Sequence, residues 1–297
     1  MLINPGRETF INFPSSILPD KTVTVFLPEP AVPLRGKYPV VYLIGAIPKD
    51  AAAVQEFFAR TDKKAILVGV NTTEEDLKNP AAVMAFFSRE LIPYIDTNYP
   101  TFAEPAFRAV AARGEQGIRL LAALLTKKEL FTRAFLLHSG TMPISFAGAD
   151  ENLRLLAAGT HEELAVLWQT LQESGRAYGT QVALRISEKI GLTEELDLDY
   201  LFAPQADVRP VKLEGSLQEK TLSIAAEQPV SFSVSVILEN GMKFDYIPLS
   251  LRISPPYLDW NPLKGVLRPI PGAAAGKVKI GVIVDKLNFT AKIRLKK

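Results

Sequence analysis

The sequence predicts an α/β fold with a mainly parallel sheet flanked by helices, followed by a small all-β domain. Residues 38–45 and 65–70 are continuous apolar runs, which is typical of strands buried on both faces. Helical patterns alternate with such runs as far as residue 204. Because 297 residues exceed the usual size of one domain, we expect two domains, an α/β one at 1–204 and a β-sandwich at 205–297.

The N-terminal elements follow from local patterns. Residues 21–28 alternate apolar and polar side chains, which is typical of a strand with one face exposed to solvent. Helical periodicity covers residues 51–60 and 79–99. In the longer segment Asn79 is suited to cap the helix and Pro80 to its first turn.

The same alternation continues to residue 186. We predict a strand at 107–112, a helix at about 115–125, strands at 134–139 and 153–158, a helix at 162–174 and a strand at 181–186. This order of strands and helices predicts a mainly parallel sheet covered by helices on both faces.

After residues 202–210 the pattern changes to short alternating runs without helical periodicity. Turn signals such as Asn240-Gly241 separate the runs. The simplest architecture is a small sandwich of about seven strands.

Composition excludes several classes of function. The net charge of +2 and the absence of a long basic block argue against a nucleic-acid partner. Without cysteine, and with only His138 and His161, the chain has no thiolate or multi-histidine metal site. We expect no cofactor, and no apolar window is long enough for a membrane span. No signal peptide is visible, so the compartment stays open, and export would require that a leader was removed.

Five collinear segments resemble one known family. They are KYPVVYLIG, ILVGVN, RELIPYIDTNYPT, RAVAARGEQGIRLLAALLTKKELFTRAFLLHSG and LRLLAAGTHEE. Together they resemble the esterase D-like branch of the α/β-hydrolase superfamily, which includes feruloyl esterases, mycolyltransferases and enterochelin esterases. More distantly, VSFSVSVILENGMKFDY and GVLRPIPGAAAGKVKIGVIV resemble bacterial immunoglobulin-like modules.

The resemblance implies a nucleophile elbow, a strand-to-helix turn with the pattern small-x-Ser-x-Gly. With Ala112 in the first small position, Gly114 stands where the serine should be. Glycine adopts φ > 0 without strain, so the turn keeps its shape and lacks a nucleophile.

A register shifted by one residue places Glu115 at the nucleophile and Gly117 at the second small position. Arg113 then occupies the first small position, where a long side chain should clash. A carboxylate nucleophile is chemically feasible, but Glu115 is equally explained as an acidic residue in the first turn of a helix.

The resemblance also implies an acid and then a histidine further along the chain. The acid position falls on Glu162, and the histidine position falls near Glu188 and Lys189. No histidine follows His161. Gly114, Glu162 and Lys189 are therefore the vestigial triad positions.

The sequence contains two other pairs of residues that could supply catalytic groups. His138 and Ser139 are adjacent, so on a strand they would point to opposite faces. His161 beside Glu162 could act as a base, or it could be a solvated loop histidine.

The expected oxyanion region has Gly45-Ala46, then Ile47 and Pro48, in place of His-Gly.

We therefore predict a catalytically inactive esterase-like protein that acts as a binding or scaffolding module. Its ligand would be a small ester, a carbohydrate such as an acylated sugar, or a protein partner. Trp260 is either a core or rim residue of the sandwich or a platform for a sugar ring. The alternative is a serine-independent or displaced-site carboxylic-ester hydrolase with Glu115 or His161 as the catalytic group. The expected binding residues are Gly45, Ala46, Gly114, Glu115 and Glu162.

Overall fold

The computed structural model describes residues 7–10, 12–28, 36–45, 51–141, 144–189, 191–226 and 228–297. Contacts between residues divide the chain into two compact units. The first contains residues 1–158 and 188–203, and the second contains residues 159–187 and 204–297. Each unit is described by itself.

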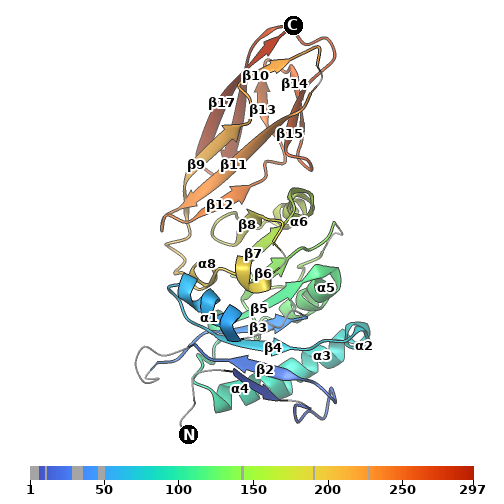
Figure 1. Cartoon of the computed structure of the whole chain (residues 1–297), viewed down its shortest axis with the longest axis vertical. Coiled ribbons are helices and arrows are strands. Elements are labelled where there is room, and N and C mark those ends of the chain that lie inside the picture. Colours follow the sequence, from blue (N-terminus) through green and yellow to red (C-terminus); the bar gives the residue numbers. More distant parts are fainter. Residues whose placement is uncertain are drawn as a thin grey trace. The chain divides into compact units, whose positions relative to one another are not determined.

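The first unit is built on one twisted sheet, and Figure 1 shows its strands lying side by side. Strands β4, β3, β5, β6 and β7 are parallel, while β1 and β2 are antiparallel to their neighbours. In order across the sheet they are β1 (Arg7–Phe10), β2 (Val23–Phe26), β4 (Ile66–Val70), β3 (Val40–Ile44), β5 (Arg108–Arg113), β6 (Arg133–Leu137) and β7 (Arg154–Gly159).

The centre of this sheet matches the apolar runs of the sequence. Every residue of β3 and β4 is buried, as expected for parallel strands covered on both faces. The predicted α/β sheet flanked by helices is confirmed.

Helices of the first unit lie against the sheet and against one another. Helix α5 contacts α2 and α3, while α1 contacts α7. The helices are α1 (Ala51–Arg60), α2 (Glu74–Lys78), α3 (Pro80–Phe86), α4 (Ile92–Asn98), α5 (Gly114–Leu125), α7 (Leu192–Glu195) and α8 (Leu198–Leu201), with a 3-10 turn at Pro105–Phe107.

The helix expected at 79–99 begins as predicted but changes its hydrogen-bond pattern midway. The Asn79 side chain accepts from the Ala82 N–H at 3.1 Å, and Pro80 follows in the first turn. Residues Phe87–Leu91 then form a π-helical segment. Pro93 comes just after it and has no N–H to donate to the carbonyl four residues back.

A buried arginine joins residues 198–203 to β7. Arg154 Nη1 donates to the carbonyls of Tyr200 at 2.9 Å and Ala203 at 2.6 Å. The guanidinium also lies over the Tyr200 ring, 5.6 Å from its centroid. Burial, with the charge of Arg154 second, lowers the pKa of neighbouring Arg133 to about 10. These interactions of Arg154 explain why the segment 188–203 belongs to the first unit.

The second unit contains one long helix, α6 (His161–Glu173), and two sheets. Strand β11 lies centrally in the first sheet, where it pairs with β9, β12 and β15. That sheet contains β8 (Val182–Ile186), β12 (Lys243–Tyr246), β11 (Val230–Leu238), β15 (Val266–Pro269), β14 (Leu258–Asn261) and β9 (Pro210–Leu217). The second sheet contains β10 (Thr221–Ser223), β17 (Leu287–Lys296), β16 (Gly276–Val284) and β13 (Arg252–Ser254).

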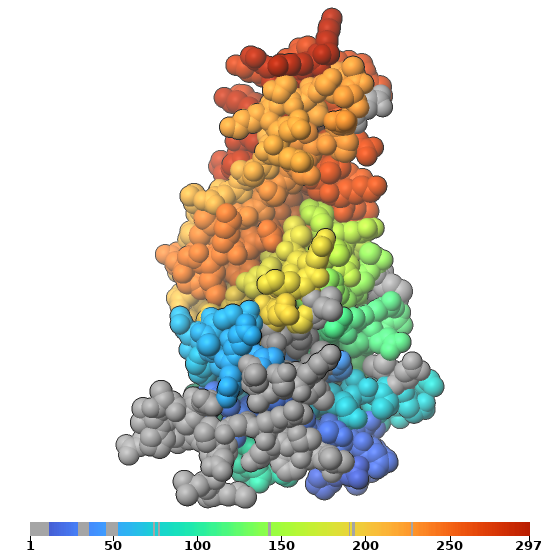
Figure 2. Space-filling view, in the orientation of Figure 1, coloured from blue at the N-terminus to red at the C-terminus, as the bar shows by residue number. Residues whose placement is uncertain are grey.

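Apolar side chains meet between these two sheets. Alternate residues of β11 and β16 are buried. Phe232 of β11 stacks on Phe289 of β17 with ring centroids 6.4 Å apart. In the space-filling view of Figure 2 the orange residues of β9, β11 and β12 form one continuous surface. The described residues after 204 thus form strands and turns without a helix, as the sequence predicts.

Residues 159–187 group with the C-terminal strands. Leu184 of β8 pairs with Asp245 of β12, and the rings of Trp168 and Tyr178 both contact Tyr246 edge-on. This grouping differs from a division at residue 204, and that boundary stays a prediction.

Candidate functional site

The carboxyl ends of three parallel strands bring the elbow region together in the first unit. Ile44 of β3 pairs with Ala112 of β5, and Arg113 pairs with Leu137 of β6. Gly45, Gly114 and His138 immediately follow these strand ends. Because adjacent strands are about 4.8 Å apart, these residues lie at one edge of the sheet, where ligands bind in open α/β folds.

Gly114 forms the turn between β5 and α5. Its φ is +71°, the left-handed conformation that the alignment requires, and it is the first residue of the helix. A methyl group added to Gly114 would meet no heavy atom within 4 Å. Arg113, at the N-cap, provides no side-chain cap, so α5 presents its first backbone N–H groups at this edge.

Gly117 of α5 faces the ends of β5 and β3. A methyl group there would lie 3.5 Å from the Ala112 Cβ and 3.8 Å from the Ile44 carbonyl oxygen, which are ordinary van der Waals distances. The left-handed turn therefore matches the register with Gly114 as nucleophile, whereas the packing at Gly117 does not require glycine and does not favour the register with Glu115.

Glu115 lies in the first turn of α5. Its Oε1 accepts from Arg119 Nη2 at 2.7 Å, and its side chain is 44% exposed. A methyl group added to Gly140, after β6, would lie 3.8 Å from the Glu115 Cβ. The turn after β6 therefore packs beside the start of α5.

His138 is the functional candidate that sequence reasoning misplaced. It follows β6 directly, has a φ of +51°, and is half-buried. Its Nε2 lies 2.9 Å from the Lys189 carbonyl oxygen. A carbonyl only accepts, so Nε2 carries the hydrogen of this bond. The signal that could have identified His138 is its position directly after β6, the strand that pairs with β5.

Ser139 does not act as a partner of His138. The serine is buried, and its hydroxyl donates to the Gly140 carbonyl at 3.3 Å. The expectation that these adjacent side chains do not form a base and nucleophile pair agrees with this geometry.

Lys189 takes part through its backbone. Its carbonyl accepts from His138, while its Nζ lies 3.8 Å from the buried Glu195 carboxylate. Glu188 is exposed.

Gly45 contributes a second glycine turn at the same edge. It is exposed with a φ of +69°, and an added methyl group would lie 3.5 Å from Thr72 Oγ1. Ala46, Ile47 and Pro48 lie outside the described residues.

The start of α2 after β4 is held by a buried ion pair. Lys21 Nζ lies 2.6 Å from Asp76 Oδ2, and Thr73 and Asp76 form a reciprocal cap. Burial raises the pKa of Asp76, but hydrogen bonds from Lys21 and Thr73 outweigh it and lower the pKa overall.

Glu162 and His161 belong to the second unit. Glu162 is exposed in the first turn of α6. His161 Nε2 lies 2.8 Å from the Pro262 carbonyl oxygen, and a methyl group added at Gly265 would lie 2.7 Å from its Cε1. The His161 ring is therefore packed against the turn after β14, a structural position rather than that of a solvated base.

Among the described residues, no group of three or more His, Cys, Asp or Glu side chains is arranged to hold a metal ion. In the same part of the chain, no helix has the length and apolarity needed to cross a membrane.

Comparisons with known proteins give structural matches only. No family model and no curated protein matches the sequence. Among solved structures, a ferulic acid esterase is 16% identical with a TM-score of 0.44, over 64% of this chain and 91% of that one. Enterochelin esterase from Shigella flexneri is 15% identical with a TM-score of 0.48, over 64% of this chain and 54% of that one.

A third match is an IroE-like serine hydrolase from Shewanella oneidensis, which is 13% identical with a TM-score of 0.47, over 66% of this chain and 77% of that one. All three are named as esterases or hydrolases. The prediction of a catalytically inactive binding or scaffolding module is contradicted by this finding and is wrong. That prediction depended on the lack of an imidazole after His161, whereas in the structure His138 follows β6, the strand paired with β5.

Proposed function

We propose that the chain is a carboxylic-ester hydrolase whose catalytic groups are displaced from the serine, acid and histidine positions of the esterase D-like pattern. The observation that carries this proposal is the placement of His138 beside Gly114. The two residues follow paired strand ends, and the His138 ring is oriented by its hydrogen bond to the Lys189 carbonyl.

In this proposal water replaces the serine hydroxyl. The open space at Gly114, where an added methyl group would meet nothing within 4 Å, admits a water molecule next to a bound ester carbonyl. The His138 imidazole accepts a proton from this water as the oxygen attacks the carbonyl carbon. The tetrahedral oxyanion points at the first N–H groups of α5. When the C–O bond breaks, the imidazolium returns the proton to the alkoxide, giving a carboxylic acid and an alcohol.

Glu115 is the second candidate catalytic group at the same edge. Its carboxylate could attack the ester in place of water, although Arg119 holds it along the helix surface at 2.7 Å. Replacement of each residue separately distinguishes the two mechanisms.

The test is hydrolysis of p-nitrophenyl acetate and butyrate by the full chain. His138→Gln keeps a side chain of similar polarity and removes the base, so we expect kcat/KM to fall by about 100-fold or more. His161→Gln is the matched control, because that imidazole also binds a backbone carbonyl but lies in the second unit.

Each outcome decides between mechanisms. Loss in His138→Gln with retention in Glu115→Gln and His161→Gln supports the water mechanism. Loss confined to Glu115→Gln supports the carboxylate nucleophile. Rates at the level of buffer in the unmodified chain overturn the proposal.

We also propose that residues 205–297 form an immunoglobulin-like sandwich. Two sheets with apolar residues alternating along β11 and β16 support it, as does the Phe232–Phe289 stack that joins them.

A further inference from the structure

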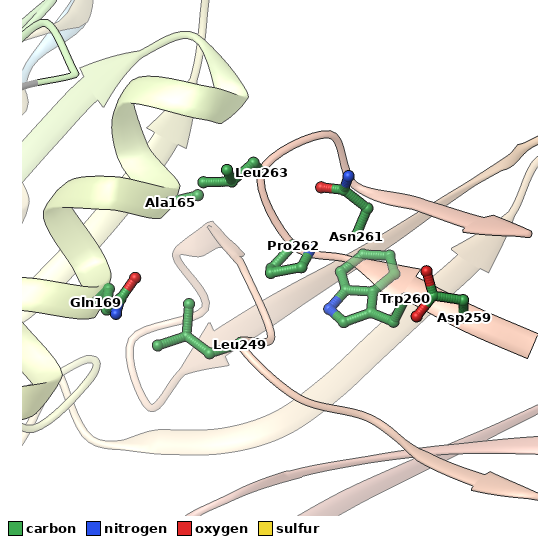
Figure 3. Close-up of a pocket in the computed structure, with 8 residues that line it drawn as sticks. All are labelled: Ala165, Gln169, Leu249, Asp259, Trp260, Asn261, Pro262 and Leu263. Atoms are coloured by element: carbon green, nitrogen blue, oxygen red, sulfur yellow. The ribbon is translucent and has the colours of Figure 1, made fainter. Parts of the chain in front are cut away.

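A hollow in the second unit lies between α6 and the end of β14 (Figure 3). It has a volume of about 350 Å³. The residues that line it come from α6, from the loop before β13, from β14 and from the turn after β14, and they include Gln169, Leu249, Asp259, Trp260, Asn261 and Pro262.

The indole of Trp260 is fixed at one side of this hollow. Its Nε1 donates to the Pro248 carbonyl at 2.7 Å, and its ring meets the Phe232 ring edge-on with centroids 6.0 Å apart. In Figure 3 the ring stands beside Pro262 and Leu249. With its one polar atom already bonded, the indole offers the hollow an apolar surface.

The polar groups around the indole include one charge. Gln169 and Asn261 supply amides, Asp259 supplies an exposed carboxylate, and none of the described residues that line the hollow is Lys or Arg. The lining therefore disfavours an anionic ligand.

The turn that carries the lining residues is held in place before any ligand arrives. His161 of α6 binds the Pro262 carbonyl at 2.8 Å, and its ring fills the space beside Gly265. Asn261 Oδ1 accepts from the Lys264 N–H at 3.1 Å within the same turn. Such preorganisation lowers the cost of binding a small ligand.

We infer that this hollow binds a neutral saccharide. A pyranose ring has an apolar face of C–H groups that packs on an indole, and hydroxyls around its rim that exchange hydrogen bonds with planar amide and carboxylate side chains. Trp260 supplies the indole for the C–H face, and Gln169, Asn261 and Asp259 supply the hydrogen-bonding side chains for the hydroxyls. The site lies wholly in the second unit and does not depend on the proposed ester hydrolysis.

Another hollow of the same unit shows the contrast. It has a volume of about 450 Å³, and its lining includes Arg176, Arg209 and Asp285. Two arginines in its lining distinguish it from the first hollow, and Ile283 on its border provides a control position.

The test titrates the full chain with neutral tetrasaccharides of glucose, xylose, mannose, galactose and N-acetylglucosamine, and with tetragalacturonate as the anionic counterpart. Binding is followed by ligand-observed NMR. We expect at least one neutral tetrasaccharide to bind with a Kd of about 1 mM and tetragalacturonate not to compete with it. Trp260→Ala should weaken binding at least tenfold, an effect of about 1.4 kcal/mol.

Two further variants separate binding from folding. Gln169→Ala changes an exposed helical residue without harming helix propensity and should weaken binding by about fivefold. Ile283→Ala, at a side chain 45% exposed, should leave the Kd unchanged. The inference is overturned if no neutral tetrasaccharide binds at about 10 mM, if tetragalacturonate binds instead, or if Gln169→Ala binds like the unmodified chain.

Discussion

Gly114 adopts a backbone conformation that residues with a side chain rarely adopt. Its φ of +71° disfavours any side chain, although the surrounding space is open. Gly114→Ala should therefore act through the backbone alone and lower the free energy of unfolding by about 1 to 2 kcal/mol. Urea denaturation at neutral pH measures this change.

Gly36 provides the matched control for that substitution. A methyl group there also meets nothing within 4 Å, and its φ is outside the left-handed region. Gly36→Ala should leave stability unchanged or raise it by up to about 1 kcal/mol, because the unfolded chain loses freedom. Equal effects at both positions would show that the turn at Gly114 does not require a left-handed residue.

At the residue scale the sequence predicts the backbone of the site better than its chemistry. The left-handed turn at Gly114 follows from the local pattern, because glycine is the residue that adopts a positive φ without strain. The position of His138 does not follow from the order of catalytic residues in the family, since it depends on which strand lies next to β5. The register of β5 and β6 supplies that information.

At the scale of elements, α2 depends on charge as well as capping. Lys21 and Asp76 form a buried pair 2.6 Å apart, so Asp76→Asn leaves the Lys21 charge without its counter-ion. We expect a loss of about 3 kcal/mol in the free energy of unfolding at pH 7. Glu75→Gln is the control, because its ion pair with Lys78 is exposed on both sides and should contribute less than about 1 kcal/mol.

The same pair predicts the direction of a pH dependence. Because the pKa of Asp76 is lowered on folding, its contribution is complete above the unfolded value of about 4 and is lost as the pH falls through the folded value. The stability difference between the unmodified chain and Asp76→Asn should thus be largest near neutral pH and shrink on acidification. A difference that grows below pH 4 would contradict this assignment. Urea denaturation curves from about pH 7 to pH 3 measure it.

Elements with a strong local pattern are those that the sequence identifies. The apolar runs become β3 and β4, and Asn79 caps α3 as expected. The π-helical segment at Phe87–Leu91 has the same apolar periodicity as a regular helix, so only the backbone hydrogen bonds distinguish it. The pairing of β8 with β12 joins residues about sixty positions apart and leaves no local signal.

For the whole molecule, the question is which residues fold together. Segment 159–187 groups with the strands after 204, and its Trp168 is buried against Tyr178 and Tyr246. A fragment of residues 1–204 lacks Tyr246, so Trp168, its one remaining tryptophan, should become exposed. We expect a red-shifted emission and no cooperative fluorescence transition in urea. The full chain carrying Trp260→Phe is the reference for native Trp168 emission; if the fragment has the same emission and unfolds cooperatively, the boundary at residue 204 is the correct one.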